Sequence, residues 1–295
     1  MTFRDGGDFE SGRVRRRAGG KGGVAVGGGV AAIAIFLLSQ ALGVDLSGLL
    51  GGGGGSSSTA DQTETTFDCT VEQANTDPEC RYQGTLYALD AYWATALPAQ
   101  TGVDYTLPGA VSFSSGTVDT ACGTASSSTG PFYCPPDTTV YVDVGFFAVL
   151  HEQFGASSGA LAQQYVVAHE VGHHIEQITG VMSSADRSGS GPESDSVRIE
   201  LMADCLAGMW VGNAATAPDP ETGRLFLEPI TDTQLADALS AAEAVGDDRI
   251  QESTSGQVNP EAWTHGSAEQ RQRWFLTGYN GGTFDQCNAL EAATL

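Results

Sequence analysis

Apolar residues recur every three or four positions in several stretches of the chain, and the clearest pattern predicts a long helix over residues 160–178. The positions that would form its buried face are Leu161, Tyr165, Ala168, Gly172, Ile175 and Ile178. Gly180 follows as a stop signal. The same spacing predicts helices over residues 86–97, 146–154 and 197–211.

Shorter patterns predict the other elements of the folded part. Alternating β-branched and aromatic residues predict strands over residues 111–114 and 139–144. Two capping boxes of the form Thr/Ser-x-x-Gln, at residues 231–234 and 267–270, predict helices that end near residues 244 and 278. The Ser- and Gly-rich stretch 183–196 is expected to be a loop.

The N-terminal part of the chain has a different pattern. Residues 1–21 are rich in Gly and Arg and predict a disordered basic tail. Residues 22–44 carry no charge and are long enough for a transmembrane helix, with the basic tail in the cytoplasm and the rest exported. A cleaved signal peptide, with a small-residue site at residues 39–41, is the alternative. A Gly/Ser-rich linker over residues 45–66 then leads to a folded domain over residues 67–295.

Charge is distributed unevenly along the chain. Residues 1–44 carry six basic and three acidic side chains, whereas the remainder carries seven Arg, no Lys and 33 acidic side chains. A surface this acidic argues against nucleic acid as a partner.

Six cysteines, an even number, are spread over the folded part and suggest disulfides in an oxidising compartment. Cys69 and Cys80 enclose a short polar loop, and Cys122 and Cys134 flank a Ser-rich loop, so each pair is expected to form a local disulfide. For the remaining two, a disulfide between Cys205 and Cys287 is preferred over a metal-bound Cys205 thiolate. Six cysteines allow fifteen connectivities, so this pairing is an expectation.

Candidate chemistry lies within the predicted helix 160–178, where His169, Glu170 and His173 form an H-E-x-x-H motif. Residues four apart share a helix face, so the two imidazoles can bind one zinc ion while Glu170 reaches a water bound to it. The alternative is a core helix whose histidines are satisfied by hydrogen bonds. A second acidic motif downstream favours a site for one Zn²⁺ per chain.

A catalytic zinc site needs a third protein ligand and an open position. The metzincin spacing would require Gly at 176 and His at 179, where the chain has Glu176 and Thr179, so that class is excluded. Glu200 and Asp204 share a helix face among apolar residues, where a bare carboxylate is costly. We expect Glu200 to bind zinc and Asp204 to accept a hydrogen bond from a ligand His. Alternatively, both face solvent or pair with Arg198.

H-E-x-x-H followed by Glu-x-x-x-Asp on a later helix resembles the gluzincin arrangement of thermolysin-type peptidases. Over about residues 82–287 the chain resembles the bacterial neutral zinc metallopeptidase family. The matching segments are residues 121–123, 130–135, 140–143, 146–147, 153–155, 165–174, 200–208, 264–266 and 271–275. The resemblance implies an α+β, zincin-like domain with a small antiparallel or mixed sheet and an active-site helix, preceded by one transmembrane helix.

The resemblance also suggests roles for individual residues. Glu170 is expected to act as the general base for a zinc-activated water. His265 is the candidate donor to the oxyanion, because gluzincins use a downstream His in this way; a surface or capping His is the alternative. Tyr165 and Tyr279 are weaker candidates for the same role.

Two histidines and one strand complete the expectations. His174 follows the motif but points about 100° away from it, so we expect a structural role, and His151 is expected at the surface. Strand 139–144 is expected to be the sheet edge that pairs with an extended substrate, with an internal strand as the alternative.

The resulting prediction is a membrane-anchored zinc endopeptidase with an extracytoplasmic catalytic domain and a peptide or protein substrate. Two alternatives stay open: a non-catalytic binding or scaffold module of the cell envelope, and a zinc amidase acting on cell-wall peptides. The sequence does not identify the substrate.

Overall fold

The computed structural model describes residues 1–4, 8–9, 12–18, 64–114, 116–126, 129–219 and 222–295. The strands are β1 (Asp8–Phe9), β2 (Arg15–Ala18), β3 (Glu64–Thr65), β4 (Cys69–Thr70), β5 (Gly109–Ser114), β6 (Thr117–Thr120), β7 (Gly123–Ser126), β8 (Phe132–Cys134) and β9 (Thr139–Asp143). The helices are α2 (Val71–Thr76), α3 (Pro78–Thr101), α4 (Phe146–Phe154), α5 (Ala160–Ile178), α6 (Val181–Ser184), α7 (Asp195–Asn213), α8 (Asp232–Ala244), α9 (Asp247–Ser255), α10 (Ala268–Tyr279) and α11 (Phe284–Cys287).

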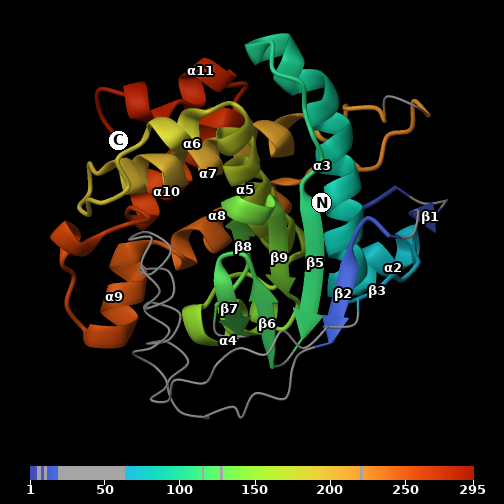
Figure 1. Ribbon diagram of the computed structural model, residues 1–295, viewed down its shortest axis with the longest axis horizontal. Coiled ribbons are helices and arrows are strands. Elements are labelled where there is room, and N and C mark those ends of the chain that lie inside the picture. The colour runs from blue at the N-terminus through green and yellow to red at the C-terminus, as the bar shows by residue number, and fades with distance from the viewer. Residues whose placement is uncertain (5–7, 10–11, 19–63, 115, 127–128, 220–221) are drawn as a thin grey trace.

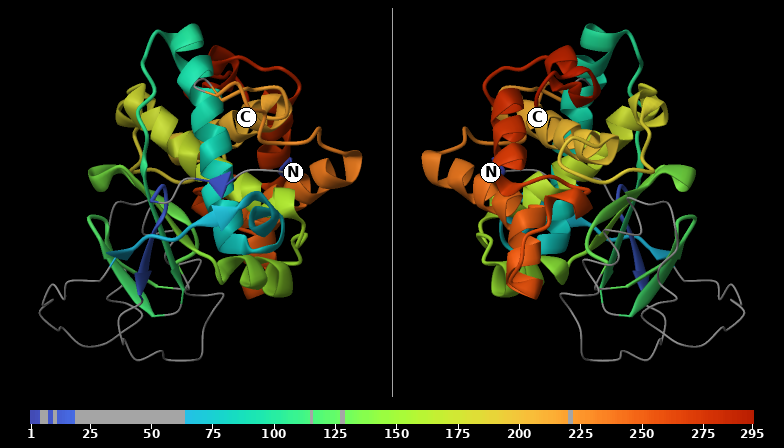
Figure 2. Two further views of the ribbon diagram at one scale, coloured as in Figure 1. Left: turned by 90° about the vertical axis from the view of Figure 1, so that its right-hand side faces the viewer. Right: turned by 90° about the vertical axis from the view of Figure 1, so that its left-hand side faces the viewer.

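A mixed sheet lies along one side of the helices (Figures 1 and 2). Its order is β3-β2-β5-β9-β8, in which β2, β5 and β9 run parallel and the two edge strands run antiparallel to their neighbours. The fold is therefore α+β with a mixed sheet, as predicted for the folded domain. The strand at residues 139–144 was expected at the edge, and this is wrong: β9 is internal, and the three-residue β8 forms the edge instead.

Helix α5 lies in the centre of the molecule, and most of its residues are buried. It packs against α7, α8 and α3, and α7 packs in turn against α10. Predicted helices match α4 and α5, and Thr231 and Ser267 form the capping boxes of α8 and α10 as expected. The core therefore surrounds the helix that carries the H-E-x-x-H motif.

The described N-terminal residues belong to this domain, in contrast to the disordered tail predicted for residues 1–21. Strand β2 pairs in parallel with β5 and antiparallel with β3 (Figure 1). Phe3, Phe9 and Val14 are buried, and Arg13 forms a bidentate pair with Asp90 of α3, at 2.6 and 3.1 Å. The arginines of this segment form ion pairs with acidic side chains of the domain.

The predicted transmembrane helix and its single-pass topology are not supported. In the parts of the chain that the structure describes, no helix combines the length and apolar character needed to cross a bilayer. The predicted span, residues 22–44, lies outside the described residues, as do residues 45–63 of the predicted linker. Because β2 and β5 are neighbours in one sheet, a single crossing between them would place one sheet on both sides of a membrane. The cytoplasmic tail and the extracytoplasmic domain of our prediction are instead one folded unit.

Three disulfides link the elements in the pairing that the sequence favoured. Cys69–Cys80 joins β4 to α3, Cys122–Cys134 joins the β6–β7 turn to β8, and Cys205–Cys287 joins α7 to α11. A Cys205 thiolate is therefore not available as a metal ligand.

Candidate metal centre

Helix α5 presents His169 and His173 on one face, one turn apart. Both are more than nine-tenths buried, and their ring centroids are 4.7 Å apart. The helix extends without Pro from Ala160 to Ile178, and its opposite faces are fixed by the core. The backbone therefore holds the two imidazoles side by side at the wall of a cleft.

Gly172 brings the second helix close to this pair. A Cβ at this position would lie 3.0 Å from the Ala203 Cα and 3.0 Å from its carbonyl oxygen, so only glycine allows α5 and α7 to approach this closely. Glu200 and Asp204 lie on either side of Ala203 in sequence, and they face the histidines across this contact. The Gly within H-E-x-G-H thus has a packing role in assembling the site.

The three expected ligands come together at one point. One ligand atom from each of His169, His173 and Glu200 lies within 4.8 Å of the others. His169 Nε2 is 3.1 Å from Glu200 Oε2, and His173 Nε2 is 3.6 Å from Glu200 Oε1. Glu200 therefore places one carboxylate oxygen against each imidazole.

A buried carboxylate fixes each imidazole from behind. His169 Nδ1 donates to Asp204 Oδ1 at 2.8 Å, and His173 Nδ1 donates to Glu176 Oε2 at 2.9 Å. Because a carboxylate only accepts, the proton of each neutral ring is held on Nδ1, and the Nε2 lone pair is free to bind a metal. Asp204 thus occupies the position expected for it, and Glu176 does the same for the second histidine.

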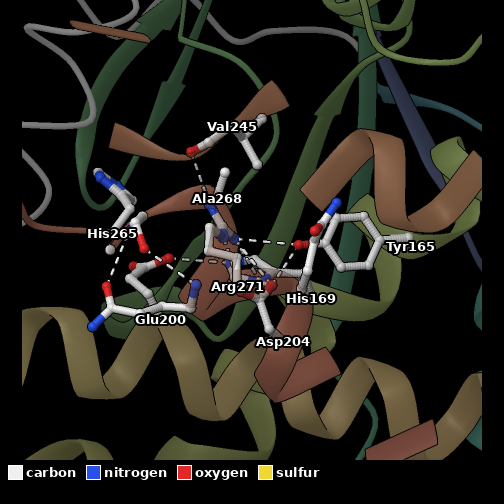
Figure 3. A network of polar contacts seen from close by, with 12 residues as sticks. Tyr165, His169, Glu200, Asp204, Val245, His265, Ala268 and Arg271 are labelled. Carbon is white, nitrogen blue, oxygen red and sulfur yellow. Dashed lines mark hydrogen bonds and ion pairs between the residues drawn. The ribbon is translucent and has the colours of Figure 1, made fainter. Parts of the chain in front are cut away.

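The charge of Asp204 is balanced by a group that the sequence analysis did not assign. Arg271 of α10 binds Asp204 through two hydrogen bonds, Nε to Oδ2 at 2.8 Å and Nη2 to Oδ1 at 3.0 Å (Figure 3). The Tyr165 hydroxyl also donates to Asp204. Burial acts to raise the pKa of Asp204, but Arg271 and His169 outweigh it and hold this pKa below its usual range. The carboxylate thus stays ionised although it is fully buried.

Zinc suits this set of donors. Two imidazoles and one carboxylate are a common catalytic zinc set, and bonds of about 2.0 Å at tetrahedral angles separate neighbouring donors by about 3.3 Å. The two separations from Glu200 to the imidazoles, 3.1 and 3.6 Å, lie on either side of this value. The separation of each imidazole from a Glu200 oxygen is therefore close to that of two donors on one zinc ion.

Glu170 lines the same cleft as the three candidate ligands. In the part of the chain that the structure describes, its carboxylate has no hydrogen-bond or ion-pair partner, although the residue is only 8% exposed. Burial raises the pKa of Glu170 above its usual range. A carboxylate without hydrogen-bond partners beside a candidate metal site is suited to proton transfer.

His265 also lines the cleft, in the loop before α10. Asp247, the first residue of α9, accepts hydrogen bonds from the backbone N–H groups of Thr264 and His265, both at 2.7 Å, and lies 3.2 Å from His265 Nδ1. Burial acts to lower the pKa of His265, but the carboxylates of Asp247 and Glu200 raise it. The structure therefore places His265 in the same cleft as the candidate ligands, with its ring beside Asp247.

The other candidates lie elsewhere or are already engaged. His174 contacts Tyr133 and the Thr106 carbonyl, which agrees with a structural role, and His151 is exposed. Tyr165 lines the cleft, but its hydroxyl is bound to Asp204. Tyr279 is not among the described residues that line the cleft.

Sequence reasoning did not assign roles to Glu176, Arg271 or Asp247. Glu176 could have been found, because it lies three positions after His173 and hence on the same helix face. Arg271 and Asp247 gave no local signal, since their partners Asp204 and His265 are 67 and 18 positions away.

An α+β domain in which two histidines of an H-E-x-x-H helix meet a glutamate of the next long helix belongs to the zinc peptidase class in its architecture. The comparison of sequences agrees. The chain belongs to the family described as "Putative neutral zinc metallopeptidase", whose model matches residues 3–290. The match includes the described N-terminal residues, consistent with their place in the domain.

Relatives with similar sequences occur in distant bacteria. The chain is 47% identical over 258 residues to the uncharacterized protein Rv2575 of Mycobacterium tuberculosis, a match that covers 86% of this chain and 85% of the relative. It is 34% identical over 297 residues to the uncharacterized protein YpfJ of Escherichia coli K12, covering 95% and 96% of the two chains. No solved structure matches.

Proposed function

We propose that this protein is a zinc-dependent endopeptidase with His169, His173 and Glu200 as metal ligands and Glu170 as general base. The observation that carries the proposal is the convergence of these three donors within 4.8 Å, beside a carboxylate that has no structural partner in the described residues. A non-catalytic binding module would have no use for such a base. The proposed substrate is an unfolded or extended segment of a peptide or protein.

Zinc bound here supplies a Lewis acid that polarises a carbonyl group and lowers the pKa of a bound water toward neutrality. Glu170 takes a proton from the attacking water and delivers it to the leaving amine nitrogen as the peptide bond breaks. His265 donates a hydrogen bond to the carbonyl oxygen as negative charge develops there. Asp247 positions His265, and Asp204 and Glu176 position the two ligand imidazoles.

Strand β8 is the proposed docking edge for the substrate backbone. It is the last strand of the described sheet, next to β9, and its residues Phe132 and Tyr133 line the cleft. An extended peptide can add to such an edge through main-chain hydrogen bonds, which give affinity with little sequence preference. This arrangement transfers to β8 the role that we had expected of β9.

The first prediction concerns the cleavage of casein, an unfolded protein. Zinc-loaded wild-type protein is expected to cleave it, a chelator to abolish cleavage, and Glu170→Gln to lower kcat by about 10²–10⁴-fold, the usual contribution of a general base. Fragments are measured by gel electrophoresis and mass spectrometry, with metal content as the control. Glu170→Gln should keep its zinc, whereas Glu200→Ala should lose most of it. Undiminished cleavage by Glu170→Gln would rule out the mechanism.

A further inference from the structure

The cleft that holds the candidate ligands also contains an arginine that has no side-chain partner in the described part of the chain. Arg187, in the loop between α6 and α7, lines this cleft together with His173 and Glu200. Its Nε is buried and has no hydrogen-bond partner. Across the residues that the structure describes, no carboxylate forms an ion pair with Arg187.

This is unusual in a chain with 36 acidic and 13 basic side chains. Most of the described arginines have a carboxylate partner, and these are Arg4, Arg13, Arg15, Arg16, Arg17, Arg198, Arg249 and Arg271. Arg81 and Arg273 also have no carboxylate ion pair among the described residues, but both lie outside the cleft. Arg81 is bound by Gln163 and the Asn75 carbonyl, and Arg273 is exposed on α10. Arg187 therefore combines a free charge with a place beside the candidate metal site.

The loop fixes the base of the Arg187 side chain. Ser196 Oγ donates to the carbonyl oxygens of Arg187, at 3.4 Å, and Gly189, at 2.9 Å. The Asp186 N–H donates to Asp195 Oδ2 at 2.8 Å. Asp195 and Ser196 begin α7, the helix that also carries Glu200. These contacts fix the position of the Arg187 backbone relative to the candidate metal site.

The lining of the cleft as a whole favours an anionic ligand for Arg187. Much of the cleft wall is apolar, and the residues of this kind include Phe146, Leu150, Phe154, Val166, Met182 and Ile250. In an apolar setting a charge pair is stronger than in water, and a buried donor without an acceptor is costly. A guanidinium presents a planar fork of N–H donors that matches a carboxylate.

We propose that Arg187 binds a carboxylate of the peptide in this cleft and gives the site a preference for acidic over neutral peptides. The carboxylate is either the C-terminus of the peptide or an acidic side chain near the scissile bond. The proposal rests on the proposed function in that the cleft receives a peptide. The proposed role of Arg187 is to select the substrate. Its loop lies outside α5 and α7, the helices that supply the candidate ligands and the general base.

The test measures binding without cleavage, using the zinc-loaded Glu170→Gln protein and dye-labelled synthetic peptide pools. Each pool has neutral random positions, with either Glu or Gln at one scanned position and either a free or an amidated C-terminus. Fluorescence anisotropy should show at least one carboxylate-bearing pool binding about tenfold more tightly than the fully neutral pool, the effect of one charge-assisted pair. The pool that shows the effect identifies the source of the carboxylate.

Arg187→Gln in the same background should reduce this tenfold preference to about one while the neutral pool binds as before. Arg187→Met, which keeps the apolar stem of the side chain, is the second variant and should show the same loss. Arg273→Gln is the matched control and should keep the preference. Equal affinity for all pools in the parent protein, or a preference that survives both Arg187 variants, would overturn the proposal.

The outcome is separable from that of the proposed function. If wild-type protein cleaves casein but the pools bind equally, the peptidase assignment stands and the role of Arg187 falls. If the preference depends on Arg187 but casein stays intact, the cleft binds acidic peptides and the catalytic assignment falls.

Discussion

Asp247 shows how one side chain can set the geometry of the cleft wall. Its carboxylate accepts from the backbone N–H groups of Thr264, His265 and Gly266, at 2.7, 2.7 and 3.2 Å, and also faces the His265 ring. Gly266 has φ of 87°, which glycine adopts readily and which turns its N–H toward the same carboxylate. Asp247 therefore holds a whole turn, and with it His265, in place.

The pH dependence of stability follows from this contact. Burial acts to raise the pKa of Asp247, but His265 and the backbone donors outweigh it and lower this pKa. A carboxyl group with a lowered pKa in the folded state adds stability above its ordinary pKa of about 3.9, and this is lost as the pH falls through the folded value. His265, whose pKa is raised, adds stability below about pH 6.5 that is lost as the pH rises through its folded value.

We therefore predict that Asp247→Asn lowers the free energy of unfolding by about 1–3 kcal/mol near pH 6. The difference in free energy of unfolding between the two proteins should become smaller toward lower pH. The wild-type Asp247 carboxylate is then protonated and stabilises the fold no more than the Asn side chain does. Urea unfolding of both proteins, with metal chelated, measures the difference across the range. A constant difference down to strongly acidic pH would contradict this explanation.

At the same scale, the sequence was informative where partners are close along the chain. The H-E-x-x-H spacing and the Glu200–Asp204 spacing each lie within one helix, so helical geometry alone was enough to place their side chains on one face. The partners Arg271 and Asp247 come from α10 and α9, and only the packing of these helices brings them to the site. No periodicity encodes such a contact.

At the scale of the elements, the packing of α7 against α10 requires the two helix backbones to approach each other closely. A Cβ on Gly208 would lie 2.0 Å from the Phe275 carbonyl oxygen, and one on Gly278 would lie 1.9 Å from the Cys205 carbonyl oxygen. Helix backbones are stiff and can yield little to such a clash. Arg271 lies one helix turn before Phe275, and Asp204 lies one turn before Gly208. The contact between the two helices therefore also sets the distance from Arg271 to Asp204.

Gly208→Ala is accordingly predicted to cost about 3 kcal/mol or more in stability, since the added methyl group meets backbone. It should also weaken zinc binding, because Arg271 and Asp204 move apart. Denaturant unfolding and zinc titration measure the two effects. Gly189→Ala is the control, since a Cβ there meets nothing within 4 Å, and it should change stability little. Equal stability of the two variants would contradict the packing argument.

Helices were predicted more successfully than strands. Apolar periodicity located α4 and α5, and capping boxes located the starts of α8 and α10. Strand order was not predictable, because β9 contains nothing that distinguishes an internal strand from an edge strand until β8 is placed beside it. The short, basic β2 lacks an apolar alternation, and its pairing depends on partners far along the chain.

On the scale of the whole molecule, the N-terminal strand joins two distant parts of the chain. Arg16 pairs in register with Thr65 of β3 on one side and Ser112 of β5 on the other. Its side chain also donates from Nε to Glu79 Oε1 of α3 at 2.9 Å. These contacts make the described N-terminal residues part of the sheet that supports the cleft.

Arg16→Pro is therefore predicted to destabilise the domain by about 1–3 kcal/mol, since proline removes a ladder hydrogen bond from an internal strand and leaves its acceptor unpaired. Arg15→Ala is the matched control: its side chain is 63% exposed, and its surface ion pair with Glu64 contributes about 0–1 kcal/mol. Thermal and denaturant unfolding compare the two. If Arg16→Pro proved as stable as the control, β2 would not be part of the folded sheet.

The parallel pairing of β2 with β5 also affects how the protein is made. Arg15 precedes its partner Val111 by 96 positions (111 − 15). At an elongation rate of about 5–20 residues per second, β5 is synthesised about 5–20 s after β2. During that interval the edge of β2 that faces β5 lacks its partner, and nascent-chain binding factors could act on it. Strand β2 thus depends for its place in the sheet on residues translated much later.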